Sequence, residues 1–208
     1  MATQSGNDPK RSDYAARSLA TRQELLSAAV EVLIELGYSE ASTLAIQRRA
    51  NMSRGRLLHQ FPSRDTLLVA AAQHLADARI EDSHRRTEWP AGQTERCDAA
   101  VEAMWMTYHE GYFWAATELW IAARKNRSLA KVLLPGEQAI GNAVRAAIDT
   151  MFGPDLSRRA EYESVRELLN TSMRGVALTY TFDPRDPSTE SHLGLWRSHA
   201  RSALGLHD

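Results

Sequence analysis

Positive charge is concentrated in one short part of an otherwise nearly neutral chain. The formal net charge of the 208 residues is −1, yet no acidic residue lies between Ala41 and Arg64. Five arginines fall within this stretch, namely Arg48, Arg49, Arg54, Arg56 and Arg64. Guanidinium groups bind phosphates and can hold the O6 and N7 atoms of guanine in the major groove. The patch therefore predicts nucleic-acid binding, although the whole chain is not a polycation.

The same stretch has the pattern of two short helices joined by a tight turn. Ser42 and Ser53 are suited to cap the two helices, and Asn51 stands where the chain must reverse. Asn adopts the left-handed conformation more readily than any residue except Gly. Ile46 and Leu57 are expected to face inward, which leaves outward a basic face without carboxylates. Such a corner can be a packing device, but an outward face of this composition favours a DNA reader.

Helical periodicity extends over most of the chain, and strand patterns are nearly absent. Residues 1–16 are polar and are expected to form a flexible tail. Beyond the basic stretch, helices are expected over residues 94–111, 113–125, 127–152, 156–181 and 189–205. Pro135 falls inside one of these helices and should kink or split it. The fold class is therefore predicted to be all-α.

The sequence STLAIQRRANMSRGRLLHQFPSRDTLL at residues 42–68 resembles the DNA-binding segment of the TetR/AcrR family of transcriptional regulators. The match extends over about residues 18–78. This resemblance implies an N-terminal three-helix helix-turn-helix DNA-binding domain at residues 17–64, with the motif at 42–61. Residues 65–208 would then form a C-terminal helical domain for effector binding and dimerisation. The implied partners are a double-stranded DNA operator, a small-molecule effector and a second copy that pairs through the last two helices.

The resemblance places candidate DNA contacts on both motif helices and at the start of the next. These candidates are Ser42, Thr43, Arg54, Gly55, Arg56, His59, Gln60 and Arg64. Two departures from the family pattern affect the contacts with DNA. Leu58 replaces a tyrosine that commonly touches a phosphate in the family, so a hydroxyl is lost and an apolar group is offered to a thymine methyl. Arg64 replaces a lysine, which keeps the charge and adds a forked set of donors.

An aromatic stretch, MWMTYHEGYFWAATELW at residues 104–120, carries polar groups as well. Such a cluster at helical spacing suits a core, but it also has the composition of a small-molecule site. Glu118 lies among apolar neighbours and needs a partner if it is buried. The resemblance implies an effector cavity here, with candidate contacts at Trp105, His109, Tyr112, Trp120 and Met173. Because Arg96 is the only Lys or Arg between Trp89 and Ala123, we expect an apolar, aromatic or acyl effector.

Two apolar stripes follow near the C-terminus. One comprises Tyr162, Val165, Leu169, Met173, Val176 and Tyr180, and the other comprises Leu193, Trp196, Ala200 and Leu204. Both stripes can face the core of a monomer, whereas the resemblance implies that the last two long helices form a four-helix dimer interface. The sequence leaves the division between these roles open, although we expect Trp196 to lie in the interface.

Two other classes of protein are compatible with a helical chain. For a small helical enzyme, the sequence lacks glycine-rich phosphate loops, a GxSxG elbow and an HExxH zinc motif, and no two of its seven histidines are spaced i, i+4. Cys97 is the only cysteine, so no internal disulfide can form, and no catalytic residue, metal or cofactor is expected. The other class is a helical adaptor that kept the motif without binding an operator, for which the loss of the family tyrosine at Leu58 is the best support.

Neither a secretory signal nor an apolar run long enough to span a membrane is found in the sequence, so the expected location is the cytoplasm. The five arginines without opposing acids count against the adaptor. We therefore expect a homodimeric, ligand-responsive repressor of transcription.

Overall fold

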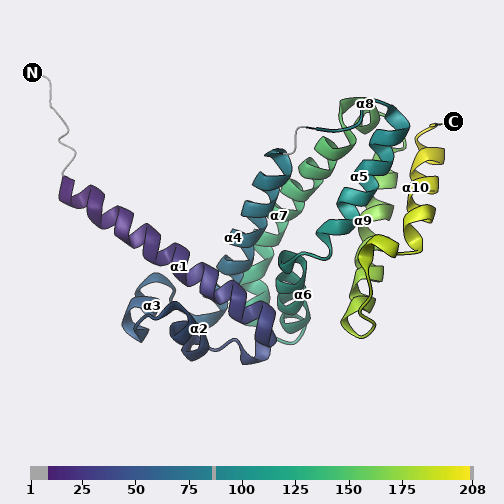
Figure 1. Cartoon of the computed structure of the whole chain (residues 1–208). Helices are drawn as coiled ribbons and strands as arrows, with labels where there is room; N and C mark the ends of the chain where they lie inside the picture. The colour runs from purple at the N-terminus through teal and green to yellow at the C-terminus, as the bar shows by residue number, and fades with distance from the viewer. Residues whose placement is uncertain (1–8, 86–87, 207–208) are drawn as a thin grey trace, which may run out of the picture. The chain divides into compact units, whose positions relative to one another are not determined.

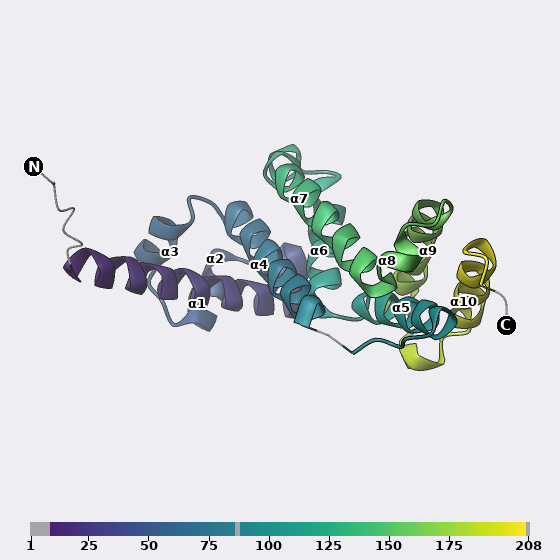
Figure 2. The same ribbon diagram turned by 90° about the horizontal axis from the view of Figure 1, so that it is seen from above.

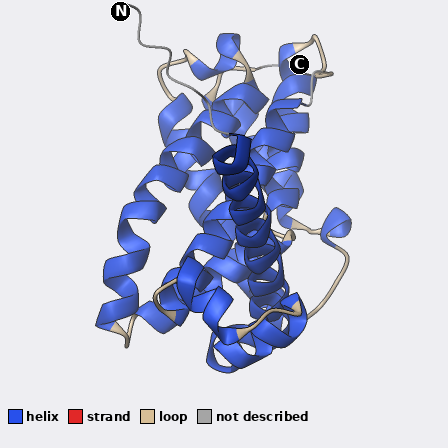
Figure 3. Ribbon diagram, turned by 90° about the vertical axis from the view of Figure 1, so that its left-hand side faces the viewer, coloured by secondary structure: helices blue, strands red, loops and turns tan. Residues whose placement is uncertain are grey.

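The computed structural model describes residues 9–85 and 88–206, and no strand occurs within these ranges (Figure 1, Figure 3). The α-helices are α1 (Pro9–Glu40), α2 (Thr43–Ala50), α3 (Arg54–Gln60), α4 (Arg64–Arg85), α5 (Gln93–Thr107), α6 (Gly111–Ala123), α7 (Arg127–Phe152), α8 (Pro154–Ser157), α9 (Tyr162–Leu178) and α10 (His192–Ala203). Two short 3₁₀ turns, η1 (Thr179–Thr181) and η2 (Pro187–Thr189), lie between α9 and α10. The all-α class predicted from the sequence is confirmed.

The helices form two compact units whose boundaries fall inside α4, α6 and α7. The first unit contains the described residues up to Leu75 together with Glu118–Leu134. The second unit contains Ala76–Thr117 and the described residues from Pro135 onward. The expected functional boundary after residue 64 stays a prediction, because compactness alone does not assign a function to either part.

α1 is longer at its N-terminal end than the sequence pattern indicated. It begins at Pro9, whose fixed φ suits the first turn of a helix, so residues 9–16 are helical where a tail was expected. The rest of the expected tail, residues 1–8, lies outside the described residues. Near its other end α1 is interrupted at Gly37, which has φ 70° and ψ 173°. Gly adopts this positive φ without a Cβ clash, and the chain turns there toward α2.

The core of the first unit holds the two short helices against α1, beside which they lie (Figure 2). Its buried side chains include Leu25, Leu26, Ala29, Val32 and Leu33 on α1, Ile46 on α2, Leu57 on α3, and Leu67, Leu68 and Ala71 on α4. Burial of a large aliphatic side chain contributes about 1.5–3 kcal/mol relative to leaving it exposed. This core therefore fixes the positions of α2 and α3 as a rigid pair.

In the second unit, α5 lies beside α9 and α10 (Figure 1, Figure 2). Two ion pairs set the register between α5 and α10. Arg201 donates from Nε to Asp98 Oδ1 at 2.8 Å and also from Nη2 to the same carboxylate. Arg197, one turn earlier on α10, pairs with Glu102, one turn later on α5. The two helices therefore run antiparallel.

Both apolar stripes predicted near the C-terminus face the core of the second unit. Buried members are Tyr162, Val165, Leu169, Met173 and Tyr180 in the first stripe, and Leu193, Trp196, Ala200 and Leu204 in the second. Trp196 is 5% exposed, and its ring centroid lies 5.0 Å from that of Trp105 in the same chain. The expected position of Trp196 in a dimer interface is therefore wrong, because periodicity identifies an apolar face but not what covers it.

Pro135 lies within α7, which runs from Arg127 to Phe152 without a break. Of the two expected outcomes, the split of this helix is therefore wrong, and the kink stays a prediction. A proline inside a helix removes one N–H donor, but the neighbouring backbone hydrogen bonds can still carry the helix through.

Candidate nucleic-acid interface

The chain reverses between α2 and α3 at a left-handed residue. Asn51 has φ 51° and ψ 43°, and it is the only non-glycine residue of positive φ in the described part of the chain. Its N–H donates to the carbonyl of Arg48 at 3.3 Å, and the N–H of Met52 donates to the carbonyl of Gln47 at 3.0 Å. These bonds close the end of α2. The turn predicted at Asn51 is confirmed.

Serine side chains cap the two motif helices as the sequence predicted. Ser42 Oγ accepts a hydrogen bond from the N–H of Ala45 at 3.1 Å, and Ser53 Oγ accepts one from the N–H of Arg56 at 3.3 Å. Such caps stabilise a helix by about 0.5–2 kcal/mol. Ser42 is exposed and Thr43 is half-buried, so both predicted contacts lie at the first turn of α2.

α3 presents one face to the core and the opposite face to solvent. Leu57 is completely buried, whereas the exposed residues are Arg54, Gly55, Arg56, Leu58 and His59. A Cβ built on Gly55 would meet no atom within 4 Å, so packing does not require glycine there. Gly costs about 1 kcal/mol relative to Ala inside a helix. Four predicted DNA contacts, Arg54, Gly55, Arg56 and His59, therefore share one exposed surface of α3.

Gln60, another predicted DNA contact, is turned toward α1. Its Nε2 donates to Ser18 Oγ at 3.0 Å, and the guanidinium of Arg22 lies 4.4 Å from the ring centroid of Phe61. These contacts hold the C-terminal end of α3 against α1. Gln60 is therefore placed at the edge of the exposed surface rather than at its centre.

Arg49 is neutralised by two glutamates of α1. Its Nη1 lies 2.9 Å from Glu31 Oε2, and its Nη2 lies 2.5 Å from Glu35 Oε2. The hydrogen bond from Arg49 lowers the pKa of Glu35 below its ordinary value. The expectation that all five arginines lack opposing acids is therefore wrong for Arg49. The acids lie outside the basic stretch of sequence, and only the packing of α1 against α2 brings them close.

Arg64 is half-buried and holds the segment that leaves α1. Its Nε donates to the carbonyl of Ala41 at 2.7 Å, and its Nη2 donates to the carbonyl of Tyr38. The guanidinium also lies 4.2 Å from the centroid of the Tyr38 ring, where a cation is attracted to the face of the aromatic ring. Arg64 is thus a structural residue of the first unit, and its contact with a phosphate stays a prediction.

A polar network within the first unit was only partly foreseen. Glu118, which the sequence indicated would need a partner, accepts the backbone N–H of Tyr38 at 2.8 Å. The Tyr38 hydroxyl donates to Asp65 Oδ1 at 2.8 Å and accepts from Asn126 Nδ2 at 3.1 Å. Burial and the bond to Asp65 raise the pKa of the Tyr38 hydroxyl. Sequence reasoning missed Tyr38, Asp65 and Asn126, and the one available signal was a carboxylate at position 118 among apolar residues.

In the second unit, Trp105 lies at the centre of an aromatic cluster. It is completely buried, and its Nε1 donates to the carbonyl of Pro187 at 2.8 Å. Its ring centroid lies 4.4 Å from that of His109 and 5.7 Å from that of Tyr180. The buried Nε2 of His109 has no hydrogen-bond partner among the described residues, and burial lowers the pKa of this imidazole. Trp105 and His109, both predicted effector contacts, are therefore in direct contact.

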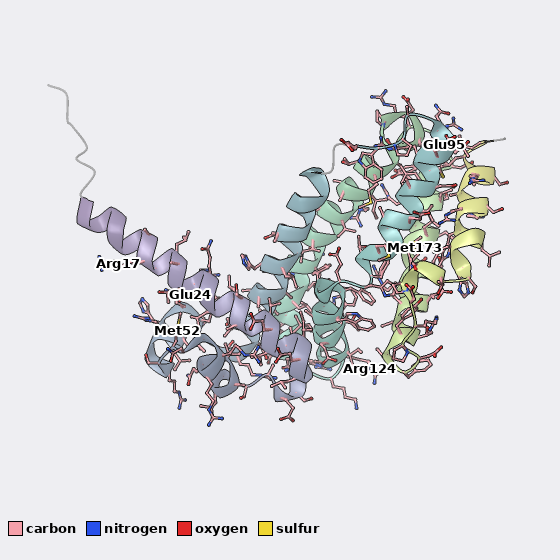
Figure 4. The ribbon with its side chains drawn as sticks, viewed as in Figure 1. Arg17, Glu24, Met52, Glu95, Arg124 and Met173 are labelled. Atoms are coloured by element: carbon pink, nitrogen blue, oxygen red, sulfur yellow. The ribbon has the colours of Figure 1, made fainter. Side chains whose placement is uncertain are left out.

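The other three predicted effector contacts are placed differently. Met173 on α9 is completely buried (Figure 4, Met173 labelled). Tyr112 is half-buried, and its burial raises the pKa of its hydroxyl. Trp120 is half-buried and belongs to the first unit, unlike the other four. The effector contacts stay a prediction, since these residues have a core role and no ligand is present.

A second polar group in this unit centres on Glu190, which is 6% exposed. Its carboxylate accepts from the Tyr180 hydroxyl at 2.8 Å and from Arg185 Nη2 at 2.9 Å, and lies 2.6 Å from His192 Nδ1. Burial alone would raise the pKa of Glu190, but the bonds from His192, Tyr180 and Arg185 outweigh it and lower that pKa to about 2. No pattern in the sequence indicated this set of contacts around Glu190.

Among the described residues, no group of three or more His, Cys, Asp or Glu side chains is arranged to hold a metal ion. The same part of the chain contains no helix suited to span a membrane.

Two short helices joined by a left-handed turn, with arginines exposed on the second, form a helix-turn-helix of the kind found in DNA-binding proteins. Residues 25–71 match the family described as bacterial regulatory proteins, tetR family. The matched segment spans the helix-turn-helix, so this part of the chain is similar to the DNA-binding segment of that family of transcriptional regulators.

Individual known proteins are similar to this chain over most of its length. The HTH-type transcriptional regulator CymR of Pseudomonas putida is 27% identical over 174 residues, which cover 82% of this chain and 84% of CymR. The fold is similar to that of Salmonella enterica GusR, with a TM-score of 0.62, 22% identity and coverage of 90% of this chain and 96% of GusR. It is also similar to FadR of Bacillus subtilis in complex with stearoyl-CoA, with a TM-score of 0.55, 16% identity and coverage of 89% and 99%.

Proposed function

We propose that this regulator is a cytoplasmic, homodimeric repressor that leaves its operator when a small apolar, aromatic or acyl molecule binds to the second unit. The observation that carries the DNA-binding part is the exposed surface of α3. Arg54 and Arg56 project from it without a carboxylate in the surrounding sequence, and the core side chain Leu57 fixes its orientation. A rigid basic helix of this size fits the major groove of DNA.

The proposed DNA contacts divide into two kinds. Arg54 and the other outward groups of α3 meet base edges, while the first turn of α2 and Arg64 meet phosphates. The complete proposed set is Ser42, Thr43, Arg54, Gly55, Arg56, His59, Gln60 and Arg64. Arg64 already donates to two carbonyls from Nε and Nη2, and its Nη1 lies 3.9 Å from Asp65 Oδ1, so a phosphate that we propose at Nη1 would share this atom with that carboxylate.

The proposed dimer uses the outward faces of α9 and α10 rather than their buried stripes. Exposed residues of α9 recur every three or four positions at Ser164, Leu168, Thr171, Gly175 and Leu178, and those near α10 do so at Ser191, Leu195, Ser198 and Ser202. Leu195 is 68% exposed, and a Cβ on Gly175 or Gly194 would meet no atom within 4 Å. Small residues with interspersed leucines allow two copies of these helices to pack closely as a four-helix bundle.

The proposed effector site is the aromatic cluster around Trp105. The cluster offers apolar surface, and the unpartnered Nε2 of His109 offers one polar group, which is the usual composition of a small-molecule site. The proposed contacts are Trp105, His109, Tyr112 and Met173, which all belong to the second unit. The acyl ligand in the FadR complex supports an effector with a substantial apolar part.

Selection of bound sequences from a random pool of double-stranded DNA tests this function directly. We expect a palindromic operator with two half-sites, because a two-fold dimer presents two copies of α3. The affinity for that operator should fall steeply with salt, since several phosphates are neutralised. Enrichment of no sequence, together with no gel shift of genomic fragments at low salt, would contradict operator binding and favour the helical adaptor.

A further inference from the structure

The exposed surface of α3 contains a single large apolar side chain. Leu58 is 44% exposed, whereas its neighbour Leu57 is completely buried. Exposed leucines also occur elsewhere, for example Leu19 and Leu36 on α1, so exposure alone does not indicate a site. The position of Leu58 within the proposed DNA-binding surface is what distinguishes it.

Helix geometry places Leu58 beside Arg54 on this surface. Successive residues of an α-helix are rotated by about 100°, so Gly55 and His59 project opposite Leu57. Leu58 projects to one side of them, on the same side as Arg54 one turn earlier. Gln60 projects to the other side, where it donates to Ser18 of α1. Leu58 and Arg54 therefore form the edge of α3 that is turned away from α1.

Gly55 leaves this edge open to a partner. It precedes Leu58 by three residues, so the two positions are adjacent on the helix surface. A Cβ at Gly55 would meet nothing within 4 Å, and the missing side chain lowers the surface next to Leu58. A flat or projecting group can therefore approach the Leu58 side chain without meeting another side chain at position 55.

The surrounding charge restricts what that partner is. Arg48, Arg54 and Arg56 are exposed, and no acidic residue lies between Ala41 and Arg64. A partner that suits both the arginines and Leu58 must be anionic overall and must present an apolar group beside its polar ones. The major groove of DNA has that chemistry at thymine, whose 5-methyl group is the apolar feature of the base edges. Leu58 itself has no group that could bond to a phosphate.

We propose that Leu58 is a specificity-determining residue that packs on the 5-methyl group of a thymine at a fixed position in each half-site. This inference rests on the proposed function, because it requires that α3 read the major groove. It assigns to Leu58 a role in base recognition rather than in holding the DNA backbone.

The experiment compares operators in which single thymines are replaced by uracil, which removes only the methyl group. The operator comes from the selection described above, and each thymine of a half-site is replaced in turn. For the wild type we expect one position per half-site at which uracil weakens binding, by roughly fourfold for each methyl group lost. Replacement in both half-sites should weaken binding by roughly 15-fold, because the two sites are distant and independent.

The Leu58→Ala variant should bind the thymine and uracil operators with equal affinity. Leu36→Ala is the matched control, since Leu36 is 48% exposed on α1 and undergoes the same substitution. This control should keep the full thymine preference. Because Leu58 is exposed, Leu58→Ala should keep the thermal stability of the wild type, so that a change in DNA binding reflects the contact and not unfolding.

Four results would overturn the role of Leu58 while leaving the proposed function intact. The first two are a selected operator without a constant thymine, and a wild type whose affinity does not change with uracil at any position. The other two concern the variant: Leu58→Ala keeps the preference for thymine, or it binds all DNA sequences more weakly by the same factor. The last result would place Leu58 against the sugar–phosphate backbone. Failure to select any operator would instead contradict the proposed function itself.

Discussion

The hydroxyl of Tyr38 donates a 2.8 Å hydrogen bond to Asp65 Oδ1, although 27 residues separate the two in sequence. The bond joins the end of α1 to the first turn of α4. Glu118 Oε2 accepts the backbone N–H of the same tyrosine at 2.8 Å, which adds α6 to the junction. One residue thus connects α1, which packs against the motif helices, to both α4 and α6 within the first unit.

Removal of the Tyr38 hydroxyl should destabilise the first unit. Tyr38→Phe keeps the ring beneath Arg64 but leaves a partly buried Asp65 oxygen without its donor. We expect a loss of about 1–2 kcal/mol in the free energy of unfolding, the usual cost of an unsatisfied polar group. Urea denaturation measures this change, with Ser39→Ala as the control because Ser39 is exposed beside it. Equal stability of Tyr38→Phe and the wild type would show that the bond contributes nothing.

Arg54 and Arg64 should differ in their effects on operator binding. Arg54→Ala should weaken binding by about 1–3 kcal/mol and relax the sequence preference at one position per half-site. Arg64→Ala should weaken all sequences alike and reduce the salt slope of log affinity by about one unit per half-site. Arg64→Lys is the matched control, since it keeps the charge and should keep the slope. If both alanine variants lost affinity uniformly with an unchanged sequence preference, the division of roles would be wrong.

A charge on the outward face of α10 should prevent dimerisation. Leu195→Glu places a carboxylate on the proposed interface, and we expect a monomer at micromolar concentration with reduced operator affinity. Leu134→Glu on α7 is the control, because Leu134 is exposed to a similar extent, 60% against 68% for Leu195. Sedimentation velocity reports the state of each variant. A wild type that sediments as a monomer at this concentration would remove the basis of the proposed dimer.

Glu190 should make the second unit sensitive to acid. Its pKa in the folded chain is about 2, below the ordinary value of 4.5, because hydrogen bonds from His192, Tyr180 and Arg185 outweigh its burial. A depressed folded-state pKa stabilises the fold above pH 4.5, and this stability is lost as the pH falls from about 4.5 to about 2.

Glu190→Gln should therefore be less stable than the wild type at pH 7, and its stability should decline less between pH 4.5 and pH 2. The difference between the two proteins at neutral pH is expected to be on the order of 2 kcal/mol. Thermal unfolding across this pH range measures both effects. Glu163→Gln on α9 is the control because Glu163 is exposed, and an identical acid profile for Glu190→Gln would contradict the assignment.

The effector and the operator should weaken each other's binding. Aromatic and fatty-acyl compounds can be screened by quenching of tryptophan fluorescence, since Trp105 lies within the proposed site. Linkage requires that a bound effector and a bound operator reduce each other's affinity by the same factor, typically about five- to 150-fold. Titration of the effector with and without saturating operator measures that factor. A compound that quenches the fluorescence but binds equally well in both cases would leave the aromatic cluster as core.

Local sequence determined the conformation of α2, the turn at Asn51 and α3 almost completely. The left-handed turn at Asn51 and the serine caps at Ser42 and Ser53 are local features. Each depends on a bond to a residue three or four positions away, so turn and capping chemistry predict all three directly. Burial of Leu57 beside an exposed Leu58 likewise follows from helical periodicity over a few residues. The all-α class follows from the same periodicity repeated along the chain.

Only the tertiary structure decided which distant groups meet. Glu31 and Glu35 neutralise Arg49 because α1 packs against α2, and Trp196 is buried because it packs on Trp105. The sequence indicated that Glu118 needs a hydrogen-bond partner, but not which one. The partner is the backbone N–H of Tyr38, which lies 80 residues away in sequence. Helical periodicity predicts which face of each helix is apolar, but it does not predict which other helix packs against that face. Long-range pairing depends on how helices dock, and this is why the sequence predicted the two motif helices and their turn but not the polar network at Tyr38.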